Sequence, residues 1–311
     1  GSPTLRSMVM AADGSVWLGG NEGLIRGVPL PWVPLQQGGQ TPLGLLARAS
    51  TEEKVYALGE GGALFQYQSD GWMLQRILTD WPAVDFSPSN AIWLSEGQTW
   101  EDGRGDKAWL MVQHDRLHCV YKQQHRRYDL ADGTLLSQVT IPALEPPSDR
   151  FVLTEDEELW GLCESGLYRL NETWEPIVPV GESGRDWVNV VLQTGPEEFW
   201  IGRETGGLLH MRSGERKEFG EADGIETANS INAACVMRNG DIWFGSNGSG
   251  LYRYDGESFT HFNKATGLQS NNVRSIYEAR DGVIWVAYRG SGVSVNRFGR
   301  WLHYGTRHGL P

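Results

Sequence analysis

Charged and polar side chains recur at one place in this sequence, a few residues after each of a series of aromatic residues. They are Glu22, Glu60, Glu96, Glu164, Arg203, Glu204, Asn247, Tyr288 and Arg289. Carboxylates held close together create a negative potential that attracts cations and repels anions. They also accept hydrogen bonds from sugar hydroxyls. If these side chains converge, they favour a cationic or polyhydroxylated ligand. The alternative is that the glutamates only make exposed loops soluble, in which case their side chains point outward.

A second group of candidate residues precedes the aromatic series. Asn229 and Asn271 stand about one strand and one turn before the next aromatic residue, and Trp187 occupies a neighbouring position in an earlier segment. An exposed tryptophan can stack on a sugar ring or an aromatic ligand, or it can cover the ends of the strands beneath it. Asparagine caps turns with its own side chain, and this structural role is the favoured one for Asn229 and Asn271.

The histidines do not form a convincing metal site. His114, His118 and His125 lie close together in the sequence, which suggests zinc ligands, but Asp115-Arg116 predicts a turn that separates the first two. The chain has no Gly-x-Ser-x-Gly motif, no P-loop and no Cys-x-x-Cys pair. We therefore expect no catalytic residue, no metal site and no cofactor.

The aromatic residues that precede the charged positions mark an internal repeat. We call them the anchors: Trp17, Tyr56, Trp160, Trp200, Trp243 and Trp285. Except for one long gap they are about 40 residues apart, and turns such as Asn239-Gly240 and Asp281-Gly282 separate short apolar runs. Both central residues of a two-residue hairpin turn need positive φ, which suits Asn-Gly and Asp-Gly. Four short strands in about 42 residues are typical of one blade of a β-propeller.

The gap between Tyr56 and Trp160 accommodates one enlarged blade, so the sequence predicts an all-β, seven-bladed propeller of four-stranded antiparallel blades. Trp93 is the preferred anchor of the enlarged blade, with residues 97–106 as a long loop; Trp109 is the alternative. A further hairpin is expected within residues 116–140, turning at Asp132-Gly133. The chain is expected to be a single domain, with blades at 3–36, 40–79, 80–145, 146–180, 184–222, 227–264 and 268–308.

Composition excludes several classes of partner. The formal net charge is −12 and the chain lacks a lysine or arginine cluster, which argues against nucleic acid and anionic membrane surfaces. Three cysteines are too few, and odd in number, for a disulfide framework. A run of roughly 18 consecutive apolar residues, as a membrane-spanning helix needs, does not occur.

The segment Thr266-Gly267-Leu268-Gln269-Ser270-Asn271-Asn272-Val273, followed by Asp281-Gly282-Val283-Ile284-Trp285, resembles the two-component regulator propeller repeat. The resemblance implies a periplasmic, ligand-sensing domain of a bacterial inner-membrane signalling protein; the carbohydrate or cationic ligand is expected from the recurring glutamates, not from the resemblance. It also implies a transmembrane helix and an output domain, a histidine kinase or diguanylate cyclase, in a protein that continues beyond residue 311 and forms a homodimer.

Two other functions remain open at this point. Streptogramin B lyase is an enzyme with a seven-bladed propeller and related Trp-centred repeats, and a protein–protein scaffold would use Trp100 in the long loop. The third strand of several repeats begins with Gly-Leu, as at Gly207-Leu208 and Gly250-Leu251, which favours the regulator repeat over the lyase pattern.

Overall fold

The computed structural model describes most of the chain, and most completely its C-terminal half. The described residues are 5–10, 16–20, 23–27, 32–34, 43–48, 55–59, 63–68, 71–78, 92–93, 98–101, 107–144, 150–163, 166–179, 187–205, 207–279, 281–297 and 299–308. Strands dominate these residues, three short 3-10 helices are present, and none of the described residues is α-helical.

The strands form seven sheets within the described ranges, each from one stretch of the chain. The first three sheets contain β1 (Leu5–Met10), β2 (Val16–Gly20), β3 (Gly23–Gly27) and β4 (Trp32–Pro34); β5 (Leu43–Arg48), β6 (Val55–Gly59), β7 (Ala63–Gln68), β8 (Gly71–Ile77) and β9 (Ile92–Trp93); and β10 (Gln98–Glu101), β11 (Lys107–Gln113), β12 (Arg116–Tyr121), β13 (Gln124–Asp129) and β14 (Leu135–Thr140).

The other four sheets have four strands each, paired in chain order. They contain β15 (Arg150–Leu153), β16 (Leu159–Cys163), β17 (Gly166–Leu170) and β18 (Trp174–Pro179); β19 (Val188–Gly195), β20 (Glu198–Arg203), β21 (Leu208–Arg212) and β22 (Glu215–Phe219); β23 (Ser230–Val236), β24 (Ile242–Asn247), β25 (Leu251–Tyr254) and β26 (Phe259–Phe262); and β27 (Val273–Glu278), β28 (Ile284–Tyr288), β29 (Val293–Arg297) and β30 (Arg300–Tyr304).

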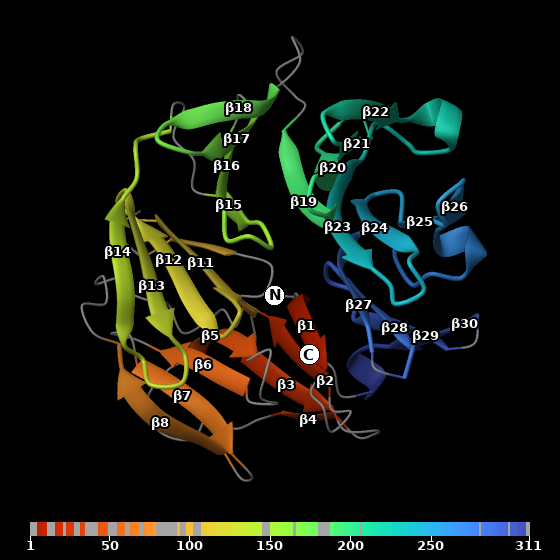
Figure 1. Cartoon of the computed structure of the whole chain (residues 1–311). Helices are drawn as coiled ribbons and strands as arrows, with labels where there is room; N and C mark the ends of the chain where they lie inside the picture. Colours follow the sequence, from red (N-terminus) through yellow and green to blue (C-terminus); the bar gives the residue numbers. More distant parts are fainter. Residues whose placement is uncertain are drawn as a thin grey trace.

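The sheets are arranged around a ring, with β1, β15, β19, β23 and β27 nearest the centre (Figure 1). In the second sheet β9 lies beyond β5, at the edge opposite to β8. β19 contacts β23, β23 contacts β27, and β27 contacts β1, so the first and seventh sheets are neighbours. The ring therefore closes by packing of the first sheet on the last. The molecule is an all-β propeller, and its seven sheets fit the predicted seven blades.

Two sheets have five strands instead of the predicted four. β9 pairs with β5 in parallel, through Leu45 with Ile92 and Leu46 with Trp93. Trp93 thus belongs to the second sheet, and its prediction as the anchor of the third blade is wrong. The prediction of residues 97–106 as a loop is also wrong in part, because β10 lies within it. A single sequence pattern, Ala-Ile-Trp-Leu, could not distinguish a parallel edge pairing from a blade strand.

The fifth strand of the third sheet is added on its inner side. The β11–β12 turn lies beside the β15–β16 turn, because Gln113 Nε2 donates to the Thr154 carbonyl at 2.8 Å and Arg116 contacts Glu157 Oε1 at 2.6 Å. β11 therefore runs in the direction of the first strands elsewhere, and β10 is an extra strand inside it. Trp109, the alternative anchor, lies on β11 and packs edge-on against Phe151 at 5.7 Å. The third sheet consequently has no tryptophan on β12, the strand equivalent to the anchor-bearing strands.

The anchors of the regular sheets fill the space between neighbouring sheets. Trp243 on β24 is 5% exposed and packs with Val273 and Val286 of the seventh sheet. Its ring stacks on Phe262 at 5.3 Å. Burying a side chain of this size removes a large apolar area from water, which makes the anchors major contributors to the stability of the ring.

Two glycines explain sequence features shared by several repeats. A Cβ at Gly245, two residues after the anchor Trp243, would lie 2.5 Å from Val273 Cγ1, so glycine lets the seventh sheet approach the sixth. Gly250 immediately precedes the third strand, β25, at φ 100°, and a Cβ there would collide with the Phe262 carbonyl of the fourth strand. Glycine therefore meets a packing requirement after the anchor and a backbone requirement before Leu251.

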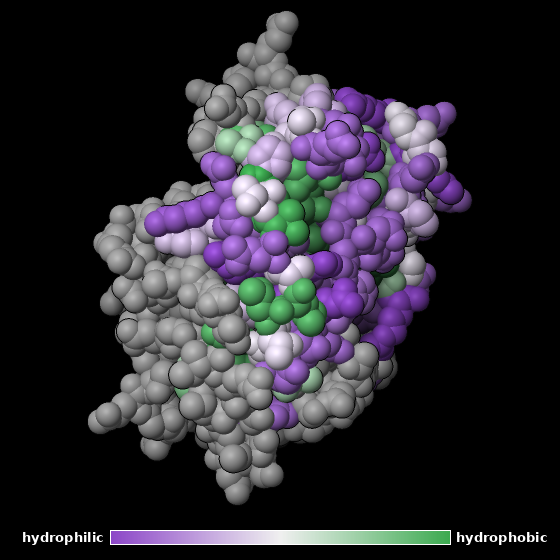
Figure 2. Space-filling view, turned by 60° about the vertical axis from the view of Figure 1, so that its left-hand side comes forward, coloured by the Kyte–Doolittle hydropathy of each residue, from purple (hydrophilic) through white to green (hydrophobic). Residues whose placement is uncertain are grey.

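The exposed surface is mixed in character. On the face shown in Figure 2, hydrophobic residues form small groups between hydrophilic ones. The most exposed large apolar side chains in the described part of the chain are Leu136, Val139, Trp187, Val236 and Leu302. Among the described residues, no helix is long and apolar enough to cross a membrane.

Candidate functional site

The predicted site positions of the fifth to seventh sheets meet at one end of the ring. The backbone N–H groups of Gly248 and Gly250 donate to the Asn271 carbonyl at 3.0 and 2.9 Å. The Arg289 N–H donates to the Asn272 carbonyl at 3.0 Å, and the Glu204 N–H to the Trp187 carbonyl at 2.7 Å. The loops that follow the anchors are therefore bonded to the segments that enter the innermost strands.

The asparagine side chains in this region are engaged in turns. Asn271 Oδ1 accepts from the backbone N–H of Lys264 at 2.8 Å. Asn229 Nδ2 donates to Ser249 Oγ at 2.9 Å and lies 3.3 Å from Glu226 Oε2. Asn271 thus bonds to the backbone of the 3-10 helix at Lys264–Thr266, whereas Asn229 bonds to two side chains. A role in ligand binding for either residue stays a prediction.

The contact between Glu226 and Ser249 was not predicted. Ser249 Oγ donates to Glu226 Oε2 at 2.8 Å, so the segment entering the sixth sheet is bonded to the loop that follows its own anchor. Ser249 is buried and Glu226 is exposed. The two residues are 23 apart in the sequence, and no local pattern signals such a pair. Asn247, close to this contact, is exposed and forms a β-bridge with Asn272.

Trp187 is exposed, as expected for a stacking residue. It retains 43% of its accessible surface and stands immediately before β19. Asn189 Nδ2 donates to Glu204 Oε2 at 2.8 Å, and Arg150 Nη2 donates to the Asn189 carbonyl at 2.5 Å. Trp187 is therefore accompanied by a carboxylate, an amide and a guanidinium group, a combination suited to a polar ring-shaped ligand.

Tyr288 and Arg203 are less accessible than predicted. Tyr288 has no exposed surface, and its hydroxyl donates to Ser294 Oγ at 2.8 Å. Burial raises the pKa of Tyr288 to about 12. Tyr288 cannot present a ring face to a ligand, because the second strand of a blade is covered on both sides. The side chain of Arg203 is 11% exposed and lies 3.5 Å from Glu218 Oε1, whereas Arg289 is exposed.

Of the five glutamates predicted to form a ring of carboxylates, the structure describes one, Glu204. Glu204 is exposed, whereas Glu22, Glu60, Glu96 and Glu164 lie outside the residues that the structure describes. Convergence of the five glutamates stays a prediction.

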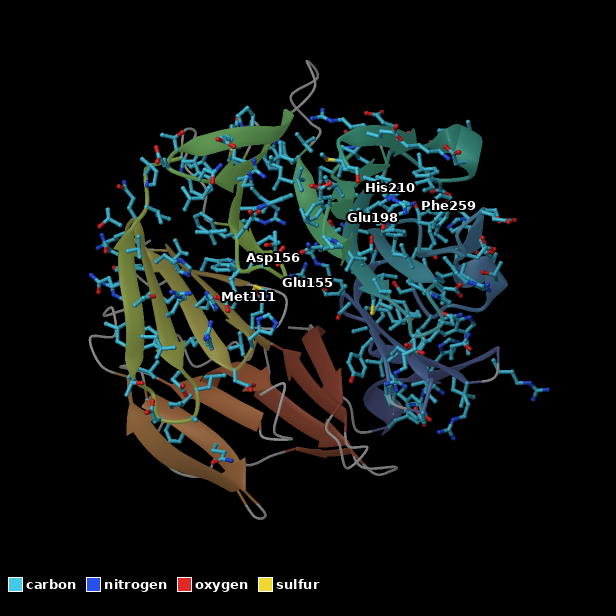
Figure 3. All side chains as sticks on the ribbon, in the orientation of Figure 1. Met111, Glu155, Asp156, Glu198, His210 and Phe259 are labelled. Carbon is cyan, nitrogen blue, oxygen red and sulfur yellow. The ribbon has the colours of Figure 1, made fainter. Side chains whose placement is uncertain are left out.

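The opposite end of the ring also presents carboxylates. Glu155 and Asp156, in the β15–β16 turn, are exposed, and with Met111 they lie near the centre of the ring (Figure 3). Farther from the centre, His210 Nε2 contacts Glu198 Oε1 at 2.8 Å and its ring stacks on Trp200 at 4.2 Å. These contacts hold the His210 ring against Trp200, which also contacts Phe259.

The histidines of the third sheet form a buried pair. A turn separates His114 from His118, but it is made by His114 and Asp115, at φ 47° and 59°, one residue before the predicted Asp115-Arg116. His118 Nδ1 and His125 Nε2 are 3.1 Å apart, and His118 has no exposed surface. Burial, together with the nearby Arg127 guanidinium, lowers the pKa of His118 to about 3 and that of His125 to about 4. Among the described residues, no three His, Cys, Asp or Glu side chains are placed to hold a metal ion.

The comparisons with known proteins agree with this architecture. The family model of the two-component regulator propeller matches residues 267–290. Among curated proteins, none matches the sequence. A solved structure of the extracellular domain of the putative one component system BT4673 from B. thetaiotaomicron is 20% identical with a TM-score of 0.66, and the alignment covers 95% of this chain and 38% of that one. The present chain is thus much shorter than this relative.

Two further structures are similar in fold. The extracellular domain of the putative hybrid two component system BT3049 from B. thetaiotaomicron is 13% identical with a TM-score of 0.51, over 99% of this chain and 46% of that one. A catalytically inactive virginiamycin B lyase from Staphylococcus aureus with quinupristin is 15% identical with a TM-score of 0.58, over 94% of each chain. The matched segment contains Asn271, Trp285 and Tyr288, and its loops belong to the candidate site. The chain is a β-propeller that carries the two-component regulator propeller repeat.

Proposed function

We propose that this propeller is the non-catalytic, extracytoplasmic sensor region of a bacterial transmembrane signalling protein. The observation that carries the proposal is the match of the two-component regulator propeller model to residues 267–290. The similarity in fold to extracellular domains of putative one- and two-component systems supports it. On this proposal, the chain lies in the periplasm and is joined to transmembrane and output domains that act on its ligand state.

The ligand would bind where the segments entering the innermost strands meet the loops after the anchors. Trp187 offers an exposed ring, and Glu204, Asn189 and Arg150 offer hydrogen-bonding groups beside it. Stacking on tryptophan with polar groups at the ring edge suits a carbohydrate. The hydrogen bonds that join these loops to the strands would hold the site in place before the ligand arrives, which reduces the ordering cost of binding.

Binding of neutral and charged oligosaccharides by isothermal titration calorimetry tests the ligand class. Replacement of Trp187 by alanine should weaken binding by about three- to tenfold, since a stacking contact contributes about 0.5–1.5 kcal/mol. Leu302, which is 50% exposed on the outer strand β30, supplies the matched control. Equal affinity of the wild type and Trp187→Ala would remove Trp187 from the site.

The lyase alternative is kept because its fold similarity extends over 94% of both chains. It predicts turnover of a bound compound that is lost when one residue of the site is replaced. Binding without turnover, measured by mass spectrometry of the recovered ligand, would exclude a lyase acting on that ligand.

A further inference from the structure

Three successive sheets carry equivalent pairs of residues at the end of the ring that holds the candidate site. One member of each pair lies at the start of the innermost strand, and the other lies four residues after the anchor. We call them the mouth pairs: Trp187 with Glu204, Ser230 with Asn247, and Asn272 with Arg289. The first and third pairs are joined by the same backbone hydrogen bond, and the second is the first pair of the β23–β24 ladder. The three pairs therefore occupy the same place in their sheets.

The mouth pairs of the sixth and seventh sheets are also joined to each other. Asn272 forms an antiparallel bridge with Asn247 of the sixth sheet. On its other side, the Asn272 carbonyl accepts from the Arg289 N–H at 3.0 Å, which continues the register of Val273 with Tyr288. Directly opposite residues of antiparallel strands carry their side chains on the same face. Asn247, Asn272 and Arg289 therefore present adjacent side chains, with Asn272 in the middle.

These three side chains are accessible and uncommitted. All three residues are exposed. Asn272 uses its backbone for its hydrogen bonds, since its N–H donates to Ser270 Oγ at 3.2 Å and its carbonyl accepts from Arg289. Within the described part of the chain, the Arg289 guanidinium has no acidic partner. The carboxylate of Glu226, on the segment entering the sixth sheet, is bonded to Ser249 and Asn229.

The chemistry of the mouth pairs changes in order around the ring. Because β19, β23 and β27 are successive neighbours, an aromatic ring with a carboxylate is followed by two neutral polar groups and then by an amide with a guanidinium group. Arg289 thus occupies the position at which the fifth sheet has Glu204. The charge of the mouth is reversed between these two sheets, contrary to the uniformly acidic ring that the recurring glutamates predict.

We infer that Asn247, Asn272 and Arg289 form a subsite for an oxyanion of the ligand, a carboxylate or a sulfate. A guanidinium group binds such anions through paired, charge-assisted hydrogen bonds. The two side-chain amides supply further N–H donors beside it. This inference rests on the proposed sensor function and specifies its ligand as an acidic carbohydrate, with its neutral part toward Trp187.

NMR titration of the ¹⁵N-labelled protein tests the subsite, because the side-chain amides of Asn247 and Asn272 and the indole N–H of Trp187 give separate signals. The probes are glucuronate, a glucose sulfate and glucose, with sodium chloride at equal ionic strength as the salt control. Glucuronate or the sulfated sugar should shift both amide signals and reach saturation. Glucose should leave the two amide signals unchanged.

Two variants and a control assign the effect to these residues. Arg289→Gln should weaken binding of the acidic sugar by at least about tenfold, the size expected for loss of a charge-assisted hydrogen bond. Asn272→Asp keeps the side-chain shape and the backbone hydrogen bonds but places a negative charge beside Arg289, so it should have a similar effect. Arg300→Gln, at an exposed position on the outer strand β30, should leave the affinity unchanged. Thermal unfolding establishes that each variant is folded.

The outcomes separate this inference from the sensor proposal. Equal amide shifts with sodium chloride, or unchanged affinity of Arg289→Gln and Asn272→Asp for the acidic sugars, would overturn the inference. A response of Trp187 to glucose and to the acidic sugars, without a response of Asn247 or Asn272, would also overturn it while leaving the sensor proposal standing. The absence of any response to all three sugars would overturn both the inference and the carbohydrate ligand.

Discussion

The sixth and third sheets pack against the sheets that follow them through different kinds of contact. The sixth sheet places Trp243 between itself and the seventh, among buried aliphatic side chains. The third sheet also packs Trp109 against the fourth, but at one end it uses ion pairs: Glu157 of the fourth sheet accepts from Arg116 at 2.6 Å and from Arg127 at 3.0 Å.

The difference shows what an extra inner strand does to a blade. With β10 inside β11, the strand equivalent to β24 is β12, which has His118 in place of a tryptophan wedge. His118 pairs with His125. The nearby arginines, Arg116 and Arg127, donate to Glu157 of the next sheet. The packing of an apolar side chain such as Trp243 does not depend on pH. The stability of a buried histidine pair close to two arginines does, because burial and the positive charges disfavour protonation of the histidines. The two interfaces should therefore fail under different conditions.

The largest effect is expected from Trp243→Ala. Removing the indole leaves a cavity between the sixth and seventh sheets, at a cost of about 3–5 kcal/mol in the free energy of unfolding. Urea unfolding followed by tryptophan fluorescence and circular dichroism measures the loss. A variant whose stability equals that of the wild type would show that this interface does not depend on its anchor, and the comparison of the two sheets would lose its basis.

A smaller, pH-dependent effect is expected at the third sheet. Histidines in the unfolded chain take up protons below about pH 6.5. The folded chain keeps His125 neutral until the pH approaches 4 and His118 until it approaches 3. The unfolded state then binds more protons, so the free energy of unfolding should decrease as the pH falls from 6.5 toward 4. Each histidine accounts for up to about 2 kcal/mol at pH 5 relative to pH 8.

Urea unfolding of the wild type and of the double variant His118→Gln/His125→Gln at pH 8, 6.5 and 5 isolates this contribution from that of the carboxylates. The variant should be less stable at pH 8 and should lose less stability on acidification. His308→Gln, at an exposed position, is the control and should keep the wild-type pH dependence. Parallel pH profiles for the wild type and the double variant would mean that the histidine pair does not titrate on unfolding.

The sequence predicted the repeated parts of the fold because their signals are local. Asn-Gly turns and Gly-Leu starts reflect requirements met within one repeat, such as the close approach of Gly250 to the Phe262 carbonyl. The anchors recur at a fixed place in each regular repeat. The parallel pairing of β9 with β5 depends instead on contacts between segments about 45 residues apart. Trp93 has the local pattern of an anchor, so nothing in its neighbourhood could exclude that role.

The candidate site was predictable to a similar degree. The repeat placed Trp187, Asn229 and Asn271 at one end of the ring, but the burial of Tyr288 depends on the neighbouring sheets, which a single sequence does not show. The β-bulge in the innermost strands has no sequence signature, since arginine, glycine and asparagine all occupy the extra position. Only the register of the strands shows that these residues are equivalent.

The sixth and third sheets also differ in the residues that adopt left-handed backbone conformation in their turns. In the sixth sheet the predicted turn contains Gly240 at φ 88°, a conformation that costs glycine little. In the third sheet the β12–β13 turn contains Lys122 and Gln123 at φ 46° and 59°. Neither residue is glycine or asparagine, so this turn has no recognisable sequence pattern. Left-handed backbone costs a residue with a side chain about 1–2 kcal/mol. Gln123→Gly should recover part of this and raise the free energy of unfolding by about 0.5–1 kcal/mol, whereas Gly240→Gln should lower it by a similar amount. Thermal unfolding of both variants measures the two shifts, and a stabilising Gly240→Gln or a destabilising Gln123→Gly would show that strain in these turns does not limit the stability of either sheet.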